Sequence, residues 1–219
     1  MEIYKVGGEV IDKFLKNVPC GKFILVHGAG GEISKKLKER RIKVIFKDGQ
    51  RFTSKEVLNV VEEIFDRVRE KMVLGIEKSV GIRGDEYGFI ARKIRGLGYV
   101  GEIVDFPHKL IMKILSSGYR VIISPLAKSI KGELLNVNAD LFTASLTDKI
   151  KVEKLKFFVD TDGIMDEDRK VIDRVARKEI NELLNKGVIN KGMLVKVKAA
   201  LKCKRNGIRR VFIGKTEIL

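Results

Sequence analysis

Residues 134–140 form a polar stretch between a predicted strand and a predicted helix. Two amides and a carboxylate occupy it: Asn136, Asn138 and Asp140. In open α/β sheets, ligands bind at the carboxyl ends of strands and against helix N-termini. A helix cap formed by Asn138 or Asp140 is the alternative interpretation, but it explains one polar residue rather than three.

A glycine-rich turn follows a strongly apolar segment that is typical of a buried parallel strand. The turn has the sequence His-Gly-Ala-Gly-Gly at residues 27–31, and a polar helix is predicted from Glu32. An arrangement of strand, glycine turn and helix brings backbone N–H groups to an anion. The spacing matches neither the dinucleotide fingerprint nor the P-loop, and a tight turn without a ligand is the alternative.

Two cationic residues, Arg51 and Lys196, each have two possible interpretations: a residue that binds a ligand, or a charge on the solvated surface. Arg51 lies just before Ser54, the predicted cap of the longest helix, and could clamp a carboxylate with two hydrogen bonds. Lys196 falls in the first turn of a helix predicted over 194–204, where a cation opposes the helix dipole. This unfavourable placement indicates a use such as binding an anion.

Composition narrows the classes of function. The chain has 219 residues, of which 44% are hydrophobic, so it can bury a sizeable core. Two cysteines without metal-ligand spacing and two histidines argue against a disulfide framework, a zinc site or histidine catalysis. No segment has the length of a membrane span, and the N-terminus lacks a signal peptide, so a cytoplasmic location is predicted.

The net charge of +16 has three candidate explanations. Lys-rich and Glu-rich surfaces are common in proteins from hot environments. A positive field also attracts anionic ligands or an acidic protein partner. Nucleic-acid binding through residues 196–210 lacks support, because 7% of residues are aromatic, Trp is absent and no binding motif is found.

Strands and helices alternate along the chain, which predicts a mainly parallel sheet with helices on both faces. The predicted strands are 3–6, 22–26, 42–46, 79–82, 120–124, 156–159 and 209–213. The predicted helices are 10–18, one from 32, one capped by Ser54, 108–117, 139–149, 179–186 and 194–204. Residues 98–103 are predicted as a hairpin or extended segment, and 187–193 as a loop. A division near residue 150 separates an N-terminal lobe, 1–150, from a smaller C-terminal lobe, 151–219.

Seven short fragments occur together and in order, over nearly the whole chain. They are Lys5-Val-Gly-Gly8, His27-Gly-Ala-Gly30, Gly49-Gln-Arg51-Phe-Thr53, Gly98-Tyr-Val-Gly-Glu102, Leu135-Asn-Val-Asn-Ala-Asp140, Val159-Asp-Thr-Asp-Gly163 and Gly192-Met-Leu-Val-Lys196-Val-Lys-Ala-Ala-Leu201. This series resembles the amino acid kinase family, and within it the acetylglutamate kinase branch. That branch includes kinases for aminoadipate or glutamate linked to a carrier protein.

The resemblance implies a three-layer αβα sandwich and a kinase that uses ATP, with Mg²⁺ carried by the nucleotide. Such enzymes phosphorylate the side-chain carboxylate of an N-blocked acidic amino acid, here N-acetylglutamate in arginine biosynthesis, to an acyl phosphate. Lobe 1–150 would bind the acceptor and lobe 151–219 the nucleotide. A homodimer is expected.

The resemblance also implies roles for thirteen residues, and no protein ligand to a metal. Lys5 and Lys196 would steady the transferring phosphoryl group, and Asp140 would hold the two lysines. The residues expected to bind the acceptor are Gly28, Ala29 and Gly30 through backbone N–H groups, Arg51 through the α-carboxylate and Asn136 through the blocked amino group. The residues expected to face the nucleotide are Gly7, Gly8, Asp160, Gly163 and Gly192.

Several positions depart from the family pattern. Ala29 replaces the middle glycine of a three-glycine turn and disfavours positive φ, so we expect an altered anion site. Ser54 stands in place of an aspartate. Arg83 replaces a serine and would add a cation near the acceptor. The chain stops soon after Ile213, where relatives continue, so a shortened nucleotide lobe is expected.

Two other functions stay open at this level. An acceptor linked to an acidic carrier protein is favoured by the charge, whereas the short loop before Arg51, without a Ser-rich insertion, weighs against it. An inactive, shortened homologue that senses a ligand is the second alternative.

Overall fold

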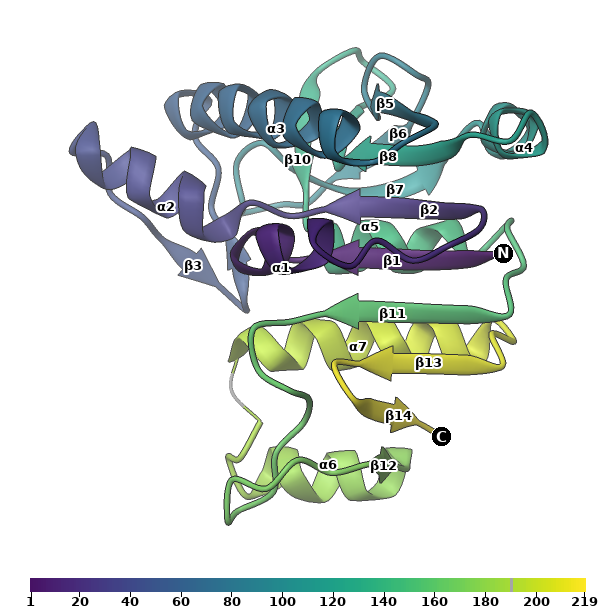
Figure 1. Cartoon of the computed structure of the whole chain (residues 1–219). Coiled ribbons are helices and arrows are strands. Elements are labelled where there is room, and N and C mark those ends of the chain that lie inside the picture. The colour runs from purple at the N-terminus through teal and green to yellow at the C-terminus, as the bar shows by residue number, and fades with distance from the viewer. Residues whose placement is uncertain (190) are drawn as a thin grey trace.

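Eight strands form the central sheet in the order β12-β14-β13-β11-β1-β2-β8-β5, in a computed structural model that describes residues 1–189 and 191–219 (Figure 1). Strands β13 and β14 pair antiparallel, and the other neighbours pair parallel. The bounds are Glu2–Val6 (β1), Phe23–His27 (β2), Ser79–Arg83 (β5), Arg120–Ser124 (β8), Lys154–Phe158 (β11), Arg174–Val175 (β12), Arg210–Ile213 (β13) and Thr216–Ile218 (β14).

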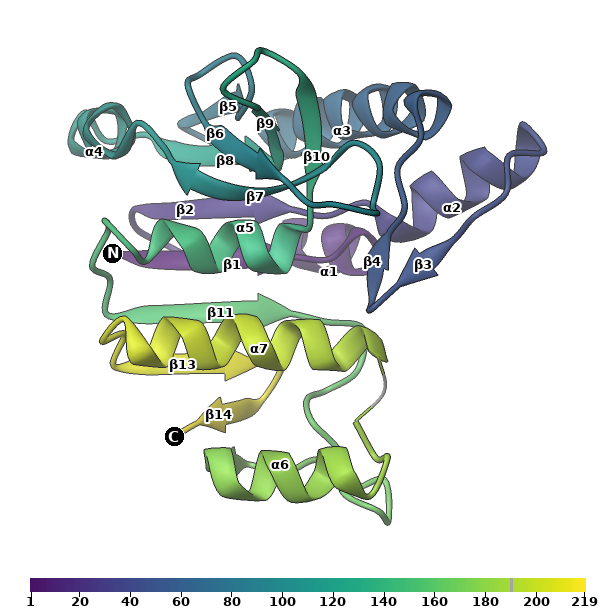
Figure 2. The same cartoon turned by 180° about the vertical axis from the view of Figure 1, so that it is seen from behind.

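Helices pack on both faces of this sheet because its apolar side chains alternate between them. They are Ile11–Leu15 (α1, after the 3-10 helix η1, Gly8–Val10), Gly30–Glu39 (α2), Lys55–Gly75 (α3), His108–Ser116 (α4), Ala139–Leu146 (α5), Arg177–Asn185 (α6) and Lys191–Arg205 (α7). Tyr4 and Val6 of β1 pack with α1, α2 and α3. Ile3 packs with the cluster that contains α4, α5, α6 and α7. In the view from behind, α5 and α7 lie in front of the sheet and run along its strands (Figure 2). The expected αβα sandwich is confirmed.

Two smaller sheets stand beside the N-terminal half of the central sheet. Ile90–Lys93 (β6), Val100–Asp105 (β7), Leu126–Lys128 (β9) and Leu134–Val137 (β10) close into a small barrel. Phe46–Lys47 (β3) and Gln50–Arg51 (β4) form a hairpin. The barrel brings β10 against β7, since Asn136 pairs with Val100, and so places the polar stretch beside the sheet.

The strand predicted over 42–46 is wrong. Only Phe46 and Lys47 are extended, and both are exposed. This cationic segment has no strand partner in the central sheet; only Ile42 and Val44 pack partly against the core. The loop predicted over 187–193 is also too long, because α7 already begins at Lys191; Asn190 lies outside the described residues.

The C-terminal residues add a strand beyond β13. After a turn at Gly214, β14 pairs with β13 and with β12. The boundary predicted near residue 150 falls between α5 and β11, and the sheet continues across it because β1 pairs with β11. Assigning one ligand to each lobe remains a prediction. No helix in the described part of the chain has the length and apolar character needed to cross a membrane.

Candidate functional site

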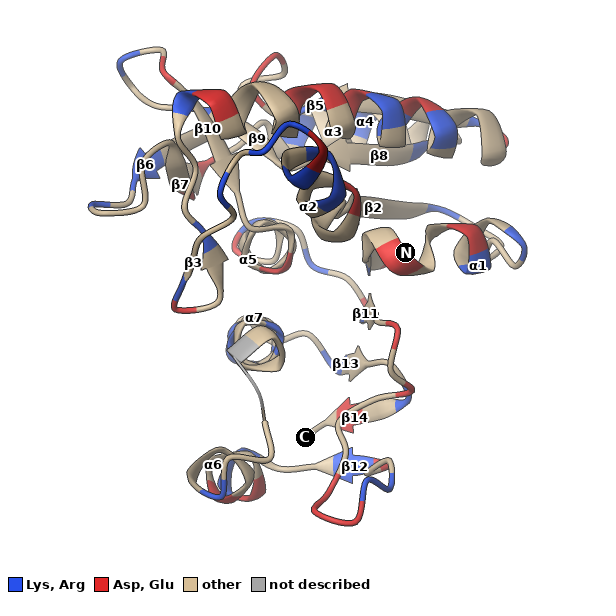
Figure 3. Ribbon diagram, turned by 90° about the vertical axis from the view of Figure 1, so that its left-hand side faces the viewer, with Lys and Arg blue, Asp and Glu red and all other residues tan. Residues whose placement is uncertain are grey.

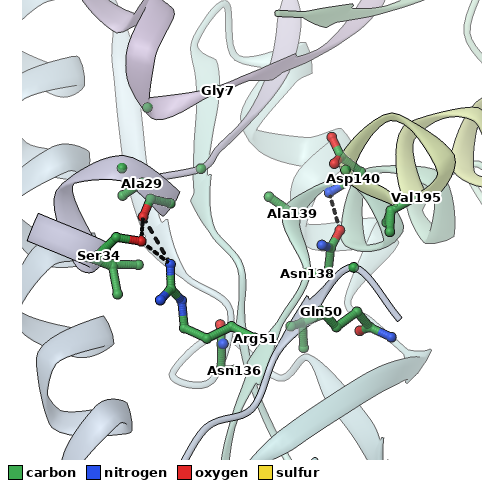
Figure 4. Close-up of a pocket in the computed structure, with 18 of the residues that line it drawn as sticks. Gly7, Ala29, Ser34, Gln50, Arg51, Asn136, Asn138, Ala139, Asp140 and Val195 are labelled. Carbon is green, nitrogen blue, oxygen red and sulfur yellow. Dashed lines mark hydrogen bonds between the residues drawn. The ribbon is translucent and has the colours of Figure 1, made fainter. Parts of the chain in front are cut away.

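A cavity of about 430 Å³ opens at the carboxyl ends of β1 and β2, beside the N-terminal ends of α2, α5 and α7 (Figure 4). Eleven of the thirteen predicted site residues line it: Lys5, Gly7, Gly8, Gly28, Ala29, Gly30, Arg51, Asn136, Asp140, Gly192 and Lys196. Segments more than 100 residues apart in the chain therefore meet in one hollow, as a single binding site requires.

Two predicted nucleotide residues do not line this cavity. Asp160 is exposed just beyond the end of β11. Gly163 is buried, and a Cβ atom there would lie 2.5 Å from Thr216 Oγ1. The glycine thus permits close packing against the β13–β14 hairpin, which is a structural reason for its presence.

The carboxylate of Asp140 joins two lysines from opposite ends of the chain. Its Oδ1 lies 3.1 Å from Lys5 Nζ, and its Oδ2 lies 3.3 Å from Lys196 Nζ. The Lys5 and Asp140 side chains are 7% and 6% exposed, whereas that of Lys196 is 23% exposed. Burial alone would raise the pKa of Asp140, but the charges and hydrogen bonds of both lysines outweigh it, and the pKa is lowered. The carboxylate is ionised and fixes both ammonium groups at the cavity wall.

The three polar residues of the 134–140 stretch have separate tasks. Asn138 is the cap of α5, since its Oδ1 accepts hydrogen bonds from the backbone N–H groups of Asp140 and Leu141 at 2.9 and 3.2 Å. Asn136 lines the cavity, and its Nδ2 donates to Thr53 Oγ1 at 3.1 Å. The cap interpretation therefore holds for one residue, and the other two face the cavity.

Two glycine turns pack against each other at the cavity floor. Gly28 N donates to Val6 O at 2.8 Å, which ties the turn after β2 to the end of β1. A Cβ atom on Gly8 would lie 3.0 Å from the Cα of Ala29. A side chain at position 8 would push the turns apart.

Replacing Gly8 with Ala is expected to lower turnover by about tenfold or more, because shifts below 1 Å in the positions of reacting groups are costly. The backbone conformation itself permits alanine, since Gly8 is not among the glycines with positive φ. Steady-state kinetics would test this. The matched control is Gly30→Ala, whose added Cβ meets nothing within 4 Å; equal losses in both variants would contradict the steric explanation.

The expected penalty at Ala29 is not found. Ala29 has φ −146° and ψ 35° at the start of α2, outside the left-handed region that favours glycine. Its methyl group is buried, with 1% of the residue exposed. The turn accommodates alanine without backbone strain.

Arg51 reaches into the cavity from β4. Its Nη2 donates to Gly30 O at 3.0 Å and to Ser34 Oγ at 2.8 Å, and its guanidinium lies 4.7 Å from the centre of the Phe46 ring. Its Nη1 is buried and has no partner within the described structure. Burial lowers the pKa of Arg51. A half-buried cation with a free donor is suited to an anionic ligand.

The sequence model of the amino acid kinase family matches residues 3–215. The chain belongs to the amino acid kinase family. Similar relatives include three acetylglutamate kinases. That of Aquifex aeolicus is 32% identical, with 96% of this chain and 83% of the relative covered. That of Endomicrobium trichonymphae is 33% identical, with 98% and 92% covered. That of Geobacillus thermodenitrificans is 34% identical, with 98% and 90% covered.

Solved structures show the same fold at lower identity. The protein smu.665 from Streptococcus mutans superposes with a TM-score of 0.86 at 22% identity, covering 99% of this chain and 97% of that one. N-acetylglutamate synthase from Neisseria gonorrhoeae gives a TM-score of 0.87 at 18% identity, covering 99% and 58%. The chain is a kinase of the amino acid kinase family by sequence, and these solved structures share its fold.

Arg83 is not a free cation at the cavity of this amino acid kinase. It forms ion pairs with Glu62, Asp66, Asp85 and Glu86 at 2.9, 3.1, 3.0 and 3.5 Å, and it is not among the residues that line the cavity. The additional cation expected from the sequence is therefore not found there, because four carboxylates, two of them on α3, neutralise the guanidinium.

The cavity residues that were not predicted include Glu9, Ser34, Phe46 and Gln50. Glu9 follows the first glycine pair directly, and Gln50 precedes Arg51, so a search of motif neighbours could have found them. Ser34 and Phe46 reach the cavity through the turn of α2 and the β3–β4 hairpin, for which the sequence holds no local signal.

Proposed function

We propose that this kinase phosphorylates the side-chain carboxylate of N-acetylglutamate with ATP, in arginine biosynthesis. The observation that carries the proposal is the convergence of Lys5 and Lys196 on Asp140, in a cavity that also holds two glycine turns and the free donor of Arg51. The names of the sequence relatives support the choice of acceptor.

The reaction needs charge stabilisation rather than a base. A carboxylate acceptor, with a pKa of about 4.3, is already ionised at neutral pH. One of its oxygens attacks the γ-phosphorus, the bond from phosphorus to the bridging oxygen breaks, and ADP leaves. Lys5, Lys196 and backbone N–H groups of the glycine turns offset the negative charge of both anions. Asp140 keeps the lysines in place.

The remaining cavity residues orient the two substrates. Arg51 would bind the α-carboxylate of the acceptor, and Asn136 its blocked amino group. Gly7, Gly8 and Gly192 would meet the phosphates. Asp160 and Gly163, which follow β11, do not line the cavity and would face the nucleotide from outside it. Mg²⁺ binds phosphates together with water and few carboxylates. Mg²⁺ would therefore arrive bound to ATP. Among the described residues, the carboxylates that line the cavity are those of Glu9 and Asp140.

A panel of acceptors tests this function. Acetylglutamate, acetylaspartate, acetylaminoadipate and free glutamate would be incubated with MgATP, and hydroxylamine would trap any acyl phosphate as a hydroxamate. We expect the strongest signal from acetylglutamate. Formation of ADP without hydroxamate, or no reaction with any carboxylate, would rule out the proposed acceptor.

Replacing Arg51 with Lys is expected to raise the KM for the acceptor by about tenfold or more and to change kcat less. Lysine keeps the charge but loses the planar pair of donors, and a hydrogen bond to a charged group contributes about 1.5–3 kcal/mol. Initial rates against acceptor concentration would show this. The control is Arg92→Lys on β6, an exposed arginine; an unchanged KM in Arg51→Lys would exclude the clamp.

One observation favours the alternative of a carrier-linked acceptor. Residues 35–47, on α2 and the segment after it, carry seven cations and one carboxylate, and this region is largely blue in Figure 3. Ser34 and Phe46, at the two ends of the run, line the cavity. An acidic carrier would dock there, beside the acceptor site.

Ionic strength separates the two acceptors. Between about 0.01 and 0.15 M salt the Debye length falls from about 30 to 8 Å. With a carrier substrate, kcat/KM should fall steeply over this range, and a Lys38→Glu, Arg41→Glu variant should lose that dependence. Efficient turnover of free acetylglutamate, together with no binding of an acidic carrier, would exclude the alternative.

A further inference from the structure

A buried histidine at the end of β2 has no part in the chemistry described so far. His27 is 0% exposed. Burial, with a smaller contribution from the charge of Arg69, lowers its pKa to about 3. The ring is therefore neutral at physiological pH and does not act as a titrating acid or base.

The contacts of this ring are specific. His27 Nε2 and Ser124 Oγ lie 2.9 Å apart and share a hydrogen bond between two buried side chains. The ring meets Phe65 of α3 edge-on, with 5.4 Å between centroids. Its Nδ1 has no partner within the described structure. A single hydrogen bond thus fixes the imidazole and ties the end of β2 to the end of β8.

Each partner of this hydrogen bond is connected to a different wall of the cavity. Gly28 follows His27 and donates to Val6 O at 2.8 Å, so the glycine turn is held by β1 on one side and by Ser124 on the other. Ser124 precedes Pro125, whose carbonyl accepts a hydrogen bond from Val137 N at 3.0 Å. Val137 lines the cavity between Asn136 and Asn138.

This chain of contacts joins two walls of the cavity. It begins at the glycine turn, whose backbone N–H groups would offset the charge between the two anions, passes through the His27–Ser124 hydrogen bond and Pro125, and ends at the polar wall on β10. The distance between the turn and the wall sets the approach of the acceptor oxygen to the phosphorus. A displacement of 1 Å in such an approach can cost about 10²-fold in rate.

We propose that His27 is a positioning residue for phosphoryl transfer. Through Ser124 it holds the glycine turn and the acceptor wall at the separation that the reaction needs. This inference rests on the proposed function, in which the N–H groups of the turn offset the charge between the two anions and Asn136, on the wall, binds the acceptor.

Substitutions that differ in reach provide the test. Glutamine places an amide near the position of Nε2 and can keep the hydrogen bond to Ser124, whereas asparagine is too short. We expect His27→Asn to lower kcat by about 10–100-fold while both KM values change less than about threefold, since only the transition-state geometry is lost. His27→Gln should recover most of the rate, and Ser124→Ala should resemble His27→Asn. The double variant His27→Asn, Ser124→Ala should lose little more than either single variant, because both act through one contact.

His108 gives a matched control, since it lies on α4 and does not line the cavity. His108→Asn should keep the rate of the unmodified chain. If His27→Asn does not fold, Ser124→Ala and His27→Gln still decide the question, because they change the hydrogen bond with little change in volume. Full kcat in Ser124→Ala would overturn the inference, whereas an unmodified chain that turns over no acceptor would overturn the proposed function itself.

Nitrogen NMR of the imidazoles adds a readout that does not depend on the acceptor. The chain has two histidines, so assignment is simple. The His27 signals should stay constant from about pH 5 to 8 and should shift when MgADP is added. Titration of His27 within that range, or His27 signals that do not change when MgADP is added, would contradict its role as a positioning residue.

Discussion

Replacing Lys196 with Ala should lower kcat by about 10²–10³-fold, the usual loss when one preorganised donor to a developing charge is removed. The Lys5→Ala variant should lose at least as much, because the Lys5 amine is the more deeply buried of the two, at 7% exposed. Each amine would compensate charge that builds up between two anions. The loss should therefore fall on kcat rather than on KM.

Lys198→Ala is the matched control for this prediction. Lys198 lies on α7 two residues from Lys196 and is exposed. Its removal takes away one positive charge from the same helix and should leave kcat unchanged. Rates measured at saturating MgATP and acceptor would decide, and a Lys196→Ala enzyme with full turnover would rule out the catalytic assignment.

Replacing Asp140 with Asn should both slow the reaction and destabilise the protein. Asparagine has the same size but no charge, so the ammonium groups of Lys5 and Lys196 lose the carboxylate that holds them at 3.1 and 3.3 Å. We expect kcat to fall by about 10²-fold or more. The free energy of unfolding should fall by about 3 kcal/mol, as when one partner of a buried ion pair is removed.

Chemical denaturation at several pH values would measure the stability part of this prediction. The pKa of Asp140 in the folded chain is lowered below its ordinary value of 3.8. The stabilisation it provides is therefore present above the ordinary value and is lost as pH falls through the lower folded value. The difference in the free energy of unfolding between the unmodified chain and Asp140→Asn should be constant near neutral pH and should shrink in acid. Asp148→Asn, which breaks an exposed pair with Lys202, should cost about 1 kcal/mol or less.

The central sheet was predictable because its strands carry local signals. Residues 120–124 form a short apolar run that ends at a proline, and the observed β8 has the same bounds. The small barrel was not predictable as a whole, since β6, β9 and β10 have three or four residues each and are defined by partners elsewhere in the chain. Within residues 98–103, predicted as a hairpin or extended segment, residues 100–103 form part of β7.

The candidate site was predictable where a residue type is unusual for its place, and less so where its role depends on a distant partner. Asp140 stood out as part of a polar stretch between a predicted strand and a predicted helix, and Lys196 because the helix predicted over 194–204 put a cation in a first turn. The observed α7 begins at Lys191, so Lys196 lies in its second turn. The partner of His27 is 97 residues away, and the carboxylates around Arg83 come from α3 as well as from its own loop. Such contacts exist only after the strands have paired, so no spacing along the sequence indicates them.

A crystal structure of the protein with MgADP, aluminium fluoride and acetylglutamate would test the central claim most directly. Aluminium fluoride takes the place of the transferring phosphoryl group. We predict that Nζ of both Lys5 and Lys196 lies within about 3.2 Å of the fluorides, with Asp140 still between the two lysines. A complex in which the mimic binds elsewhere, or in which either amine points into solvent, would contradict the account.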